Sequence, residues 1–141
     1  MIWNIEIKTP HAVDPALEIL KQFRSTHQLI VTSFFHDILP QVSKVLNIEC
    51  GALVAHRPVN TSFFLRQLNL FDKSINTIVF PVEFICRDIV SIAHEEGFKV
   101  FSYDIENLND YRKCCKFNVD AIITNHPDLY SSKMNLQDRS G

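Results

Sequence analysis

The chain has 141 residues, of which 46% are hydrophobic and 21% charged, which is typical of one globular domain and lies outside the range of disordered chains. Its formal net charge of -2, from 14 basic and 16 acidic residues without a long basic run, argues against a nucleic-acid-binding protein. With only three glycines, it has no glycine-rich phosphate loop of the Rossmann or P-loop type.

Six short β-rich runs alternate with longer helical stretches. Several runs are apolar on successive residues, which is typical of strands covered on both faces, as in parallel sheets. The runs start about 20–30 residues apart, a spacing that suits parallel strands joined by crossover helices. They cover residues 2–7, 29–35, 51–55, 77–80, 100–105 and 121–124. The pattern predicts an α/β fold, either an open sheet or part of a (β/α) barrel.

Capping residues and prolines predict where the intervening helices begin. The expected starts are, in chain order, Asp14 before Pro15, Asp37, Thr61 or Ser62, the segment after Pro81, and Asn109 or Asp110. Gly97 is placed to end the fourth helix. We expect a last partial helix over residues 127–134, so that residues 1–134 form one domain and residues 135–141 a polar tail.

Polar residues follow each run, at the carboxyl ends of the expected strands, where α/β proteins place their chemistry. Most of them are explained by exposed loops. Glu6 and Lys8 differ because residues two apart in a strand share a face, here the one opposite Ile5 and Ile7. If this strand is central, the two charges form either a structural ion pair or a functional site, and spacing alone favours neither.

Four segments resemble the glycerophosphodiester phosphodiesterase family, in order and in spacing, over nearly the whole chain. They are the strand IEIK at residues 5–8, IVTSF at 30–34, KVFSYDIEN at 99–107 and NVDAIITNHPD at 118–128. The last resembles the family's closing segment and is the most specific. The resemblance implies a partial TIM-type (β/α) barrel of the PLC-like phosphodiesterase kind, with about six parallel strands and crossover helices.

The resemblance also implies roles for three residues. Glu6 matches a glutamate that binds a divalent cation, Ca²⁺ or Mg²⁺. Lys8 matches a catalytic lysine that contacts the substrate phosphate and offsets its charge. Tyr103 stands where the family commonly has a tryptophan that lines the glycerol pocket. The implied parent reaction, in lipid metabolism, is metal-dependent hydrolysis of a glycerophosphodiester to an alcohol and glycerol 3-phosphate.

The sequence departs from the family pattern. Tyr103 replaces a tryptophan, and the other replacements are Phe80 for histidine, Asp104 for threonine, Ala121 for glycine and Asn125 for aspartate. The family's His-Arg-Gly, Glu-x-Asp and His-Asp segments have no counterpart here. His11 and His36 follow strand ends but are interpreted as loop histidines. We therefore expect a truncated barrel with weak cation binding and little activity.

Three hypotheses remain open at this point. The chain is part of a phosphodiesterase, a non-catalytic remnant barrel that acts as a binding or interaction module, or an unrelated doubly wound domain. In a partial barrel the outer strands have exposed edges, which favour self-association. A doubly wound sheet would reverse its strand order at a switch point.

The N-terminus lacks the basic start and continuous apolar stretch of a signal peptide, and no segment is apolar enough to span a bilayer. The four cysteines show no zinc-site spacing. We expect Cys114 and Cys115 to be helix neighbours with one thiol facing inward. Free thiols fit a reducing compartment, so the expected location is cytoplasmic, without a transmembrane segment.

Overall fold

The computed structural model describes residues 2–127. It contains one sheet of six parallel strands in the order β1-β2-β3-β4-β5-β6. The strands are β1 (Ile2–Glu6), β2 (Gln28–Ser33), β3 (Cys50–Leu53), β4 (Ile75–Pro81), β5 (Lys99–Tyr103) and β6 (Ala121–Ile122). The sequential order contains no switch point, so the hypothesis of a doubly wound domain is wrong.

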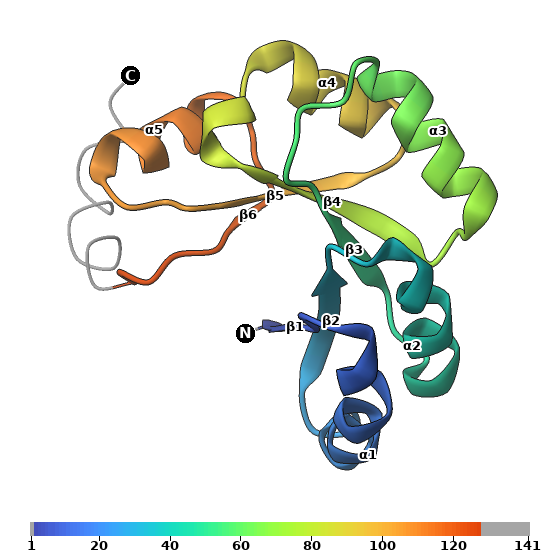
Figure 1. Ribbon diagram of the computed structural model, residues 1–141. Helices are drawn as coiled ribbons and strands as arrows, with labels where there is room; N and C mark the ends of the chain where they lie inside the picture. The colour runs from blue at the N-terminus through green and yellow to red at the C-terminus, as the bar shows by residue number, and fades with distance from the viewer. Residues whose placement is uncertain (1, 128–141) are drawn as a thin grey trace.

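Five helices connect the strands: α1 (Val13–Phe23), α2 (Leu39–Leu46), α3 (Thr61–Phe71), α4 (Arg87–Glu95) and α5 (Leu108–Lys116). Figure 1 shows them along the outer side of a curled sheet whose concave side stays open between β1 and β6. Parallel strands joined by same-handed crossovers place every helix on one face. The predicted partial barrel is confirmed: the six strands form a curled half-barrel.

The core has two layers because strand side chains alternate between the two faces of the sheet. The main layer fills the space between the sheet and the helices and includes Val31, Ile78 and Phe80, all fully buried. A smaller layer lies on the concave face, with one residue from each of the four inner strands: Ile30, Leu53, Val79 and Phe101. This layer supports the concave face on which the polar side chains lie.

Several helices begin elsewhere than predicted. A 3-10 turn over Pro10–Ala12 leads directly into α1, so Asp14 lies inside the first turn and does not cap it. Asp37 likewise lies within the turn at His36–Ile38, before α2 begins at Leu39. After Pro81 another turn, Val82–Phe84, delays α4 to Arg87. At these points a 3-10 turn precedes the α-helix, so the first α-helical residue differs from the one that the capping signals predict.

Asparagine side chains cap α3 and α5. Asn60 Oδ1 accepts the backbone N–H of Phe63 at 2.9 Å, one turn into α3. Asn107 Oδ1 accepts the N–H groups of Asn109 at 2.9 Å and Asp110 at 3.0 Å. Each asparagine lies before the predicted starts and satisfies N–H groups that a helix leaves unpaired. Gly97, with φ of 86°, follows α4 as predicted.

Two of the cysteines are buried and one is exposed. Cys114 faces the interior and Cys115 the solvent, as predicted for neighbours on a helix. Burial raises the pKa of the Cys50 thiol to about 12, so this group stays protonated near neutral pH.

Within residues 2–127, no helix has the length and apolar character needed to cross a membrane. The partial helix and the tail expected after Pro127 lie outside the described residues.

Gly51 allows β2, β3 and β4 to pack closely. A Cβ atom at this position would lie 2.9 Å from Thr32 Cγ2 and 3.4 Å from Val79 Cγ2. We expect Gly51→Val to lower the free energy of unfolding by about 1–3 kcal/mol through overpacking. Urea denaturation measures the change, with Ala55→Val at an exposed position after β3 as the matched control. Equal stability of the two variants would contradict this account.

Candidate functional site

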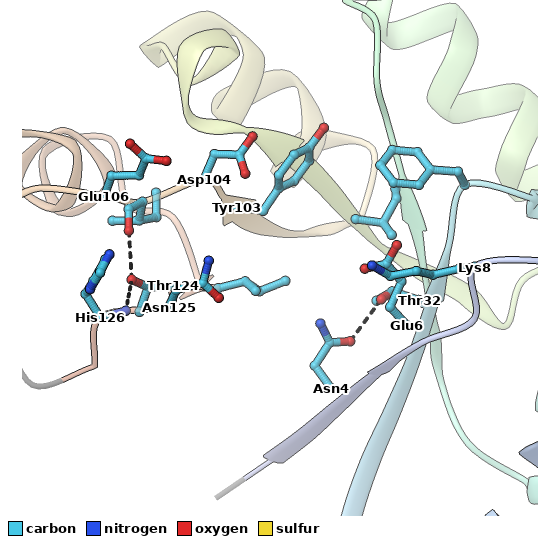
Figure 2. A pocket seen from close by; sticks show the side chains of 14 residues that line it. Asn4, Glu6, Lys8, Thr32, Tyr103, Asp104, Glu106, Thr124, Asn125 and His126 are labelled. Carbon is cyan, nitrogen blue, oxygen red and sulfur yellow. Dashed lines mark hydrogen bonds between the residues drawn. The ribbon is translucent and has the colours of Figure 1, made fainter.

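A polar pocket of about 370 Å³ lies on the concave face at the carboxyl ends of the strands. One wall comes from β1 and β2, and the opposite wall from the segments that follow β5 and β6 (Figure 2). Its lining residues are Asn4, Glu6, Lys8, Thr32, Phe34, Leu53, Tyr103, Asp104, Ile105, Glu106, Ile123, Thr124, Asn125 and His126. In (β/α) architectures this end of the strands is where active sites are built.

The β1 wall brings Glu6 and Lys8 together, as predicted from their spacing. Ile7 between them points to the other face and is buried. The wall is fixed by its neighbours, since Thr32 Oγ1 donates to Asn4 Oδ1 at 3.0 Å and Ser33 Oγ donates to the Ile7 carbonyl at 2.7 Å. These bonds hold the end of β1 against β2 and so orient the two charged side chains.

Glu6 and Lys8 are not a structural ion pair. No hydrogen bond or ion pair joins either side chain to another group in the described part of the chain. Both side chains are exposed, and β1 is an edge strand rather than a central one. The cost of burying unpaired charges therefore does not arise, and both groups can contact a ligand.

The opposite wall carries Asp104, Glu106 and His126 (Figure 2). Thr124 Oγ1 donates to the Ile105 carbonyl at 2.7 Å and accepts the His126 N–H at 3.0 Å, which ties the segment after β6 to the segment after β5. Asp104 has φ of 60°, in the left-handed region that non-glycine residues rarely adopt. This backbone turn lies where the pocket wall begins.

Tyr103 closes the inner side of the pocket. Its hydroxyl donates to the Val54 carbonyl at 3.0 Å, and its ring stands edge-on to Phe34 at 6.2 Å and 89°. Burial is the main cause that raises the pKa of this hydroxyl, and the charges of three carboxylates raise it further, those of Asp104, Glu83 and Glu6. The hydroxyl therefore stays protonated at neutral pH and keeps its bond to the Val54 carbonyl, directly after β3.

The described residues of the pocket do not form a complete metal site. Among residues 2–127, no three histidine, cysteine, aspartate or glutamate side chains lie close enough together to coordinate one. Calcium takes 6–8 oxygen ligands and magnesium requires nearly octahedral coordination. The described residues offer Glu6 as a single carboxylate on the β1 wall, which does not fit a complete cation site.

A second hollow of about 660 Å³ lies at the amino ends of the strands. Its charged groups are used structurally: Lys99 Nζ pairs with Glu49 Oε2 at 3.0 Å, and Asp120 Oδ2 accepts the Val100 N–H at 2.7 Å. A hydrogen bond to Asn76, and after it the pairing with Lys99, lower the pKa of Glu49. The unpaired charges of the first pocket make it the better candidate for a site.

The histidines behave as the sequence predicts in part. His11 and His36 do not line the pocket, and His36 Nε2 lies 2.7 Å from the Leu53 carbonyl oxygen. His126 does line it, although sequence reasoning had not singled it out among the polar residues at strand ends. The available signal was its place shortly after the sixth strand, inside the segment at residues 118–128 that has the most specific resemblance.

Comparison with known proteins supports one family. The sequence model described as the glycerophosphoryl diester phosphodiesterase family matches residues 2–129. A glycerophosphodiester phosphodiesterase from Caldanaerobacter subterraneus is 25% identical over 137 residues, covering 89% of this chain and 52% of that protein. The chain therefore spans about half the length of this curated relative.

Solved structures show the same fold. A candidate glycerophosphodiester phosphodiesterase from Galdieria sulphuraria matches with a TM-score of 0.71 and 20% identity. The match covers 89% of this chain and 54% of the Galdieria chain. An Oleispira antarctica phosphodiesterase in complex with the product sn-glycerol-3-phosphate matches with a TM-score of 0.70 and 19% identity. That match covers 90% of this chain and 52% of the other.

Proposed function

Since this chain belongs to the glycerophosphoryl diester phosphodiesterase family, we propose that its polar pocket binds the phosphate of a glycerophosphodiester. The observation that carries the proposal is that Glu6 and Lys8 lie on one wall at the carboxyl ends of the strands, where neither forms an ion pair within residues 2–127. The Oleispira relative, which shares the fold, holds sn-glycerol-3-phosphate as its product. The parent reaction is hydrolysis of a glycerophosphodiester to an alcohol and glycerol 3-phosphate.

In this proposal each of the three predicted residues has a separate role. Lys8 contacts the phosphate and offsets the negative charge that develops during transfer. Tyr103 and Phe34 form the apolar side of the pocket against which the carbon skeleton of glycerol packs. Glu6 contributes one oxygen ligand to a divalent cation, Ca²⁺ or Mg²⁺, because members of the family are generally metal-dependent.

We propose that the chain alone has little activity. One carboxylate on the β1 wall gives weak cation affinity. Among residues 2–127, His126 is the only histidine that lines the pocket, so these residues offer few donors and acceptors for the two proton transfers of a hydrolysis. A cytoplasmic location is likewise a proposal, supported by four cysteines that are all free thiols.

A second candidate function is a non-catalytic interaction module. The observation that favours it is that β1 and β6 are the edges of the sheet and that β1 exposes Ile2 and Trp3, by 58% and 42%. Exposed edge strands can pair with another chain, including a second copy of this one. A single monomeric species at high concentration in sedimentation velocity would count against this candidate.

The proposed function is tested by ligand binding. We expect the purified chain to bind sn-glycerol 3-phosphate with a dissociation constant near the millimolar range, about -4 kcal/mol, and to bind glycerol more weakly, because glycerol offers no charge to Lys8. Isothermal titration calorimetry measures both ligands. Equal affinity for glycerol and glycerol 3-phosphate would refute a phosphate site. If the chain hydrolysed a glycerophosphodiester, and if both a chelator and Glu6→Ala abolished this turnover, the expected inactivity would be refuted. The proposed phosphate site would not be.

A further inference from the structure

The two walls of the polar pocket differ in charge. Lys8 extends from the β1 wall, whereas the facing wall carries the carboxylates of Asp104 and Glu106 (Figure 2). Together with Glu6, the lining residues hold three carboxylates against one ammonium, which leaves two excess negative charges with His126 neutral. Like charges repel, so this balance disfavours a ligand that is only negative. It favours a ligand that carries a positive charge in addition to its phosphate.

The fold does not use the carboxylates of Asp104 and Glu106. Both residues are exposed. Within residues 2–127, neither carboxylate accepts a hydrogen bond or forms an ion pair. Asp110 nearby shows the contrast, because its Oδ2 accepts the Glu106 N–H at 3.3 Å and Asn107 Nδ2 at 2.8 Å. Asp110 therefore has a structural role, while Asp104 and Glu106 are available to a ligand.

The backbone on both sides of Asp104 is held in place. Before it, the Tyr103 hydroxyl donates to the Val54 carbonyl at 3.0 Å. After it, the Ile105 carbonyl accepts Thr124 Oγ1 at 2.7 Å. Asp104 itself has φ of 60°, a conformation that costs free energy in a residue other than glycine and that is concentrated at functional sites. A wall fixed in this way loses little conformational entropy when a ligand binds.

The carboxylates of the pocket are spread out and do not converge on one point. Among residues 2–127, no three acidic, histidine or cysteine side chains come close enough together to coordinate a metal ion. Their charge nevertheless extends across the pocket, since after burial the charges of Asp104, Glu83 and Glu6 raise the pKa of the Tyr103 hydroxyl. Such an arrangement suits an organic cation, because an ammonium group does not need the full set of oxygen ligands that a metal ion does.

We propose that the pocket prefers glycerophosphodiesters whose alcohol carries a primary ammonium group, as ethanolamine does. The inference rests on the proposed function, because Lys8 must hold the phosphate. The ammonium then lies at Asp104 and Glu106 on the facing wall. Such a diester is a zwitterion and adds no net charge to the pocket, whereas the diester of a neutral alcohol adds a further negative charge. Asp104 departs from the family pattern, so the preference is inferred for this chain and not for the family.

The chemistry of the acidic wall favours a primary ammonium over a trimethylammonium group. A primary ammonium donates up to three hydrogen bonds, which carboxylate oxygens accept. A trimethylammonium group has no N–H and is typically bound in a cage of aromatic rings. Among the described residues, the pocket is lined by two phenyl-type rings, those of Phe34 and Tyr103, which stand edge-on to each other at 89° and form no such cage.

Titration calorimetry with three diesters tests the proposal, in a buffer with a chelator so that no divalent cation competes for the carboxylates. We expect the wild type to bind glycerophosphoethanolamine roughly fivefold more tightly than glycerophosphoglycerol, about the effect of one exposed ion pair, and more tightly than glycerophosphocholine. The double variant Asp104→Asn with Glu106→Gln should lose this preference, and asparagine tolerates the left-handed backbone at position 104. The matched control is Asp88→Asn with Glu95→Gln, which removes the same two charges from exposed positions of α4.

Three results would overturn the proposal. They are equal affinity of the wild type for glycerophosphoethanolamine and glycerophosphoglycerol, an equal loss of preference in the α4 control, and equal affinity for the choline and ethanolamine diesters. None of these results would affect the phosphate site at Lys8. That site would fail if Lys8→Ala left the affinity for all three diesters unchanged, so the two failures are distinguishable. Thermal melts of each variant show whether the substitutions leave the fold intact.

Discussion

Replacing Lys8 with alanine is expected to weaken the binding of sn-glycerol 3-phosphate by roughly tenfold to a hundredfold, the usual effect of losing a hydrogen bond to a charged group. Lys8 is an exposed cation on the β1 wall, and no carboxylate of the described residues forms an ion pair with it. The other wall is acidic, with Asp104 and Glu106. Without Lys8 a phosphate would face uncompensated negative charge.

Titration calorimetry of the two proteins at one ionic strength measures the loss, because salt screens an exposed charge. Lys99→Ala is the matched control: Lys99 starts β5 and lines the hollow at the amino ends of the strands, where it pairs with Glu49. The control should bind the ligand like the wild type. An unchanged affinity in Lys8→Ala, or an equal loss in Lys99→Ala, would contradict the proposed site.

Replacing Phe80 with alanine is expected to lower the free energy of unfolding by about 3–5 kcal/mol, the usual cost of a cavity left by a buried aromatic ring. Phe80 is fully buried in the layer between the sheet and the helices. Its strand, β4, pairs with both β3 and β5, so the neighbouring backbone has little freedom to collapse into the space. Such a loss is a large share of the stability of a small domain.

Urea denaturation followed by circular dichroism measures this change. Phe63→Ala is the control, since Phe63 is 61% exposed and exposed substitutions usually change stability by less than about 0.5 kcal/mol. If the two phenylalanine variants unfolded at the same denaturant concentration, the assignment of Phe80 to the core would be wrong.

The strands were predictable because a strand that is buried on both faces has apolar residues at successive positions. Runs such as residues 77–80 are apolar on successive positions, and the structure places Ile78, Val79 and Phe80 on alternate faces, all fully buried. The alternation of β1 predicted that Glu6 and Lys8 share a face, and both line the same pocket. These predictions depend only on the period of a strand.

Helix starts were less predictable because they depend on the backbone that precedes them. Asp14 beside Pro15 resembles a cap, yet the turn at Pro10–Ala12 had already begun the helical backbone. Asn60 and Asn107 cap α3 and α5 from one or more residues before the expected starts. Asparagine side chains suit turns as well as caps, so sequence alone did not separate the two uses.

The acidic wall of the pocket could not be predicted from local sequence. Asp104 and Glu106 follow β5 and His126 follows β6, and only the curl of the sheet places these segments opposite Glu6 and Lys8 (Figure 2). The left-handed backbone at Asp104 is a further feature that its residue type does not require. The sequence predicted that Glu6 and Lys8 share one wall, whereas the wall that faces them is seen only in the three-dimensional arrangement.

The most direct test is a map of the amide chemical shifts of the chain during titration with sn-glycerol 3-phosphate. We expect the largest changes at Glu6, Lys8 and Tyr103, and we expect Lys8→Ala to remove them. Changes confined to the hollow around Lys99 and Asp120, or no saturable change at millimolar ligand, would contradict the assignment of this pocket as a phosphodiester site.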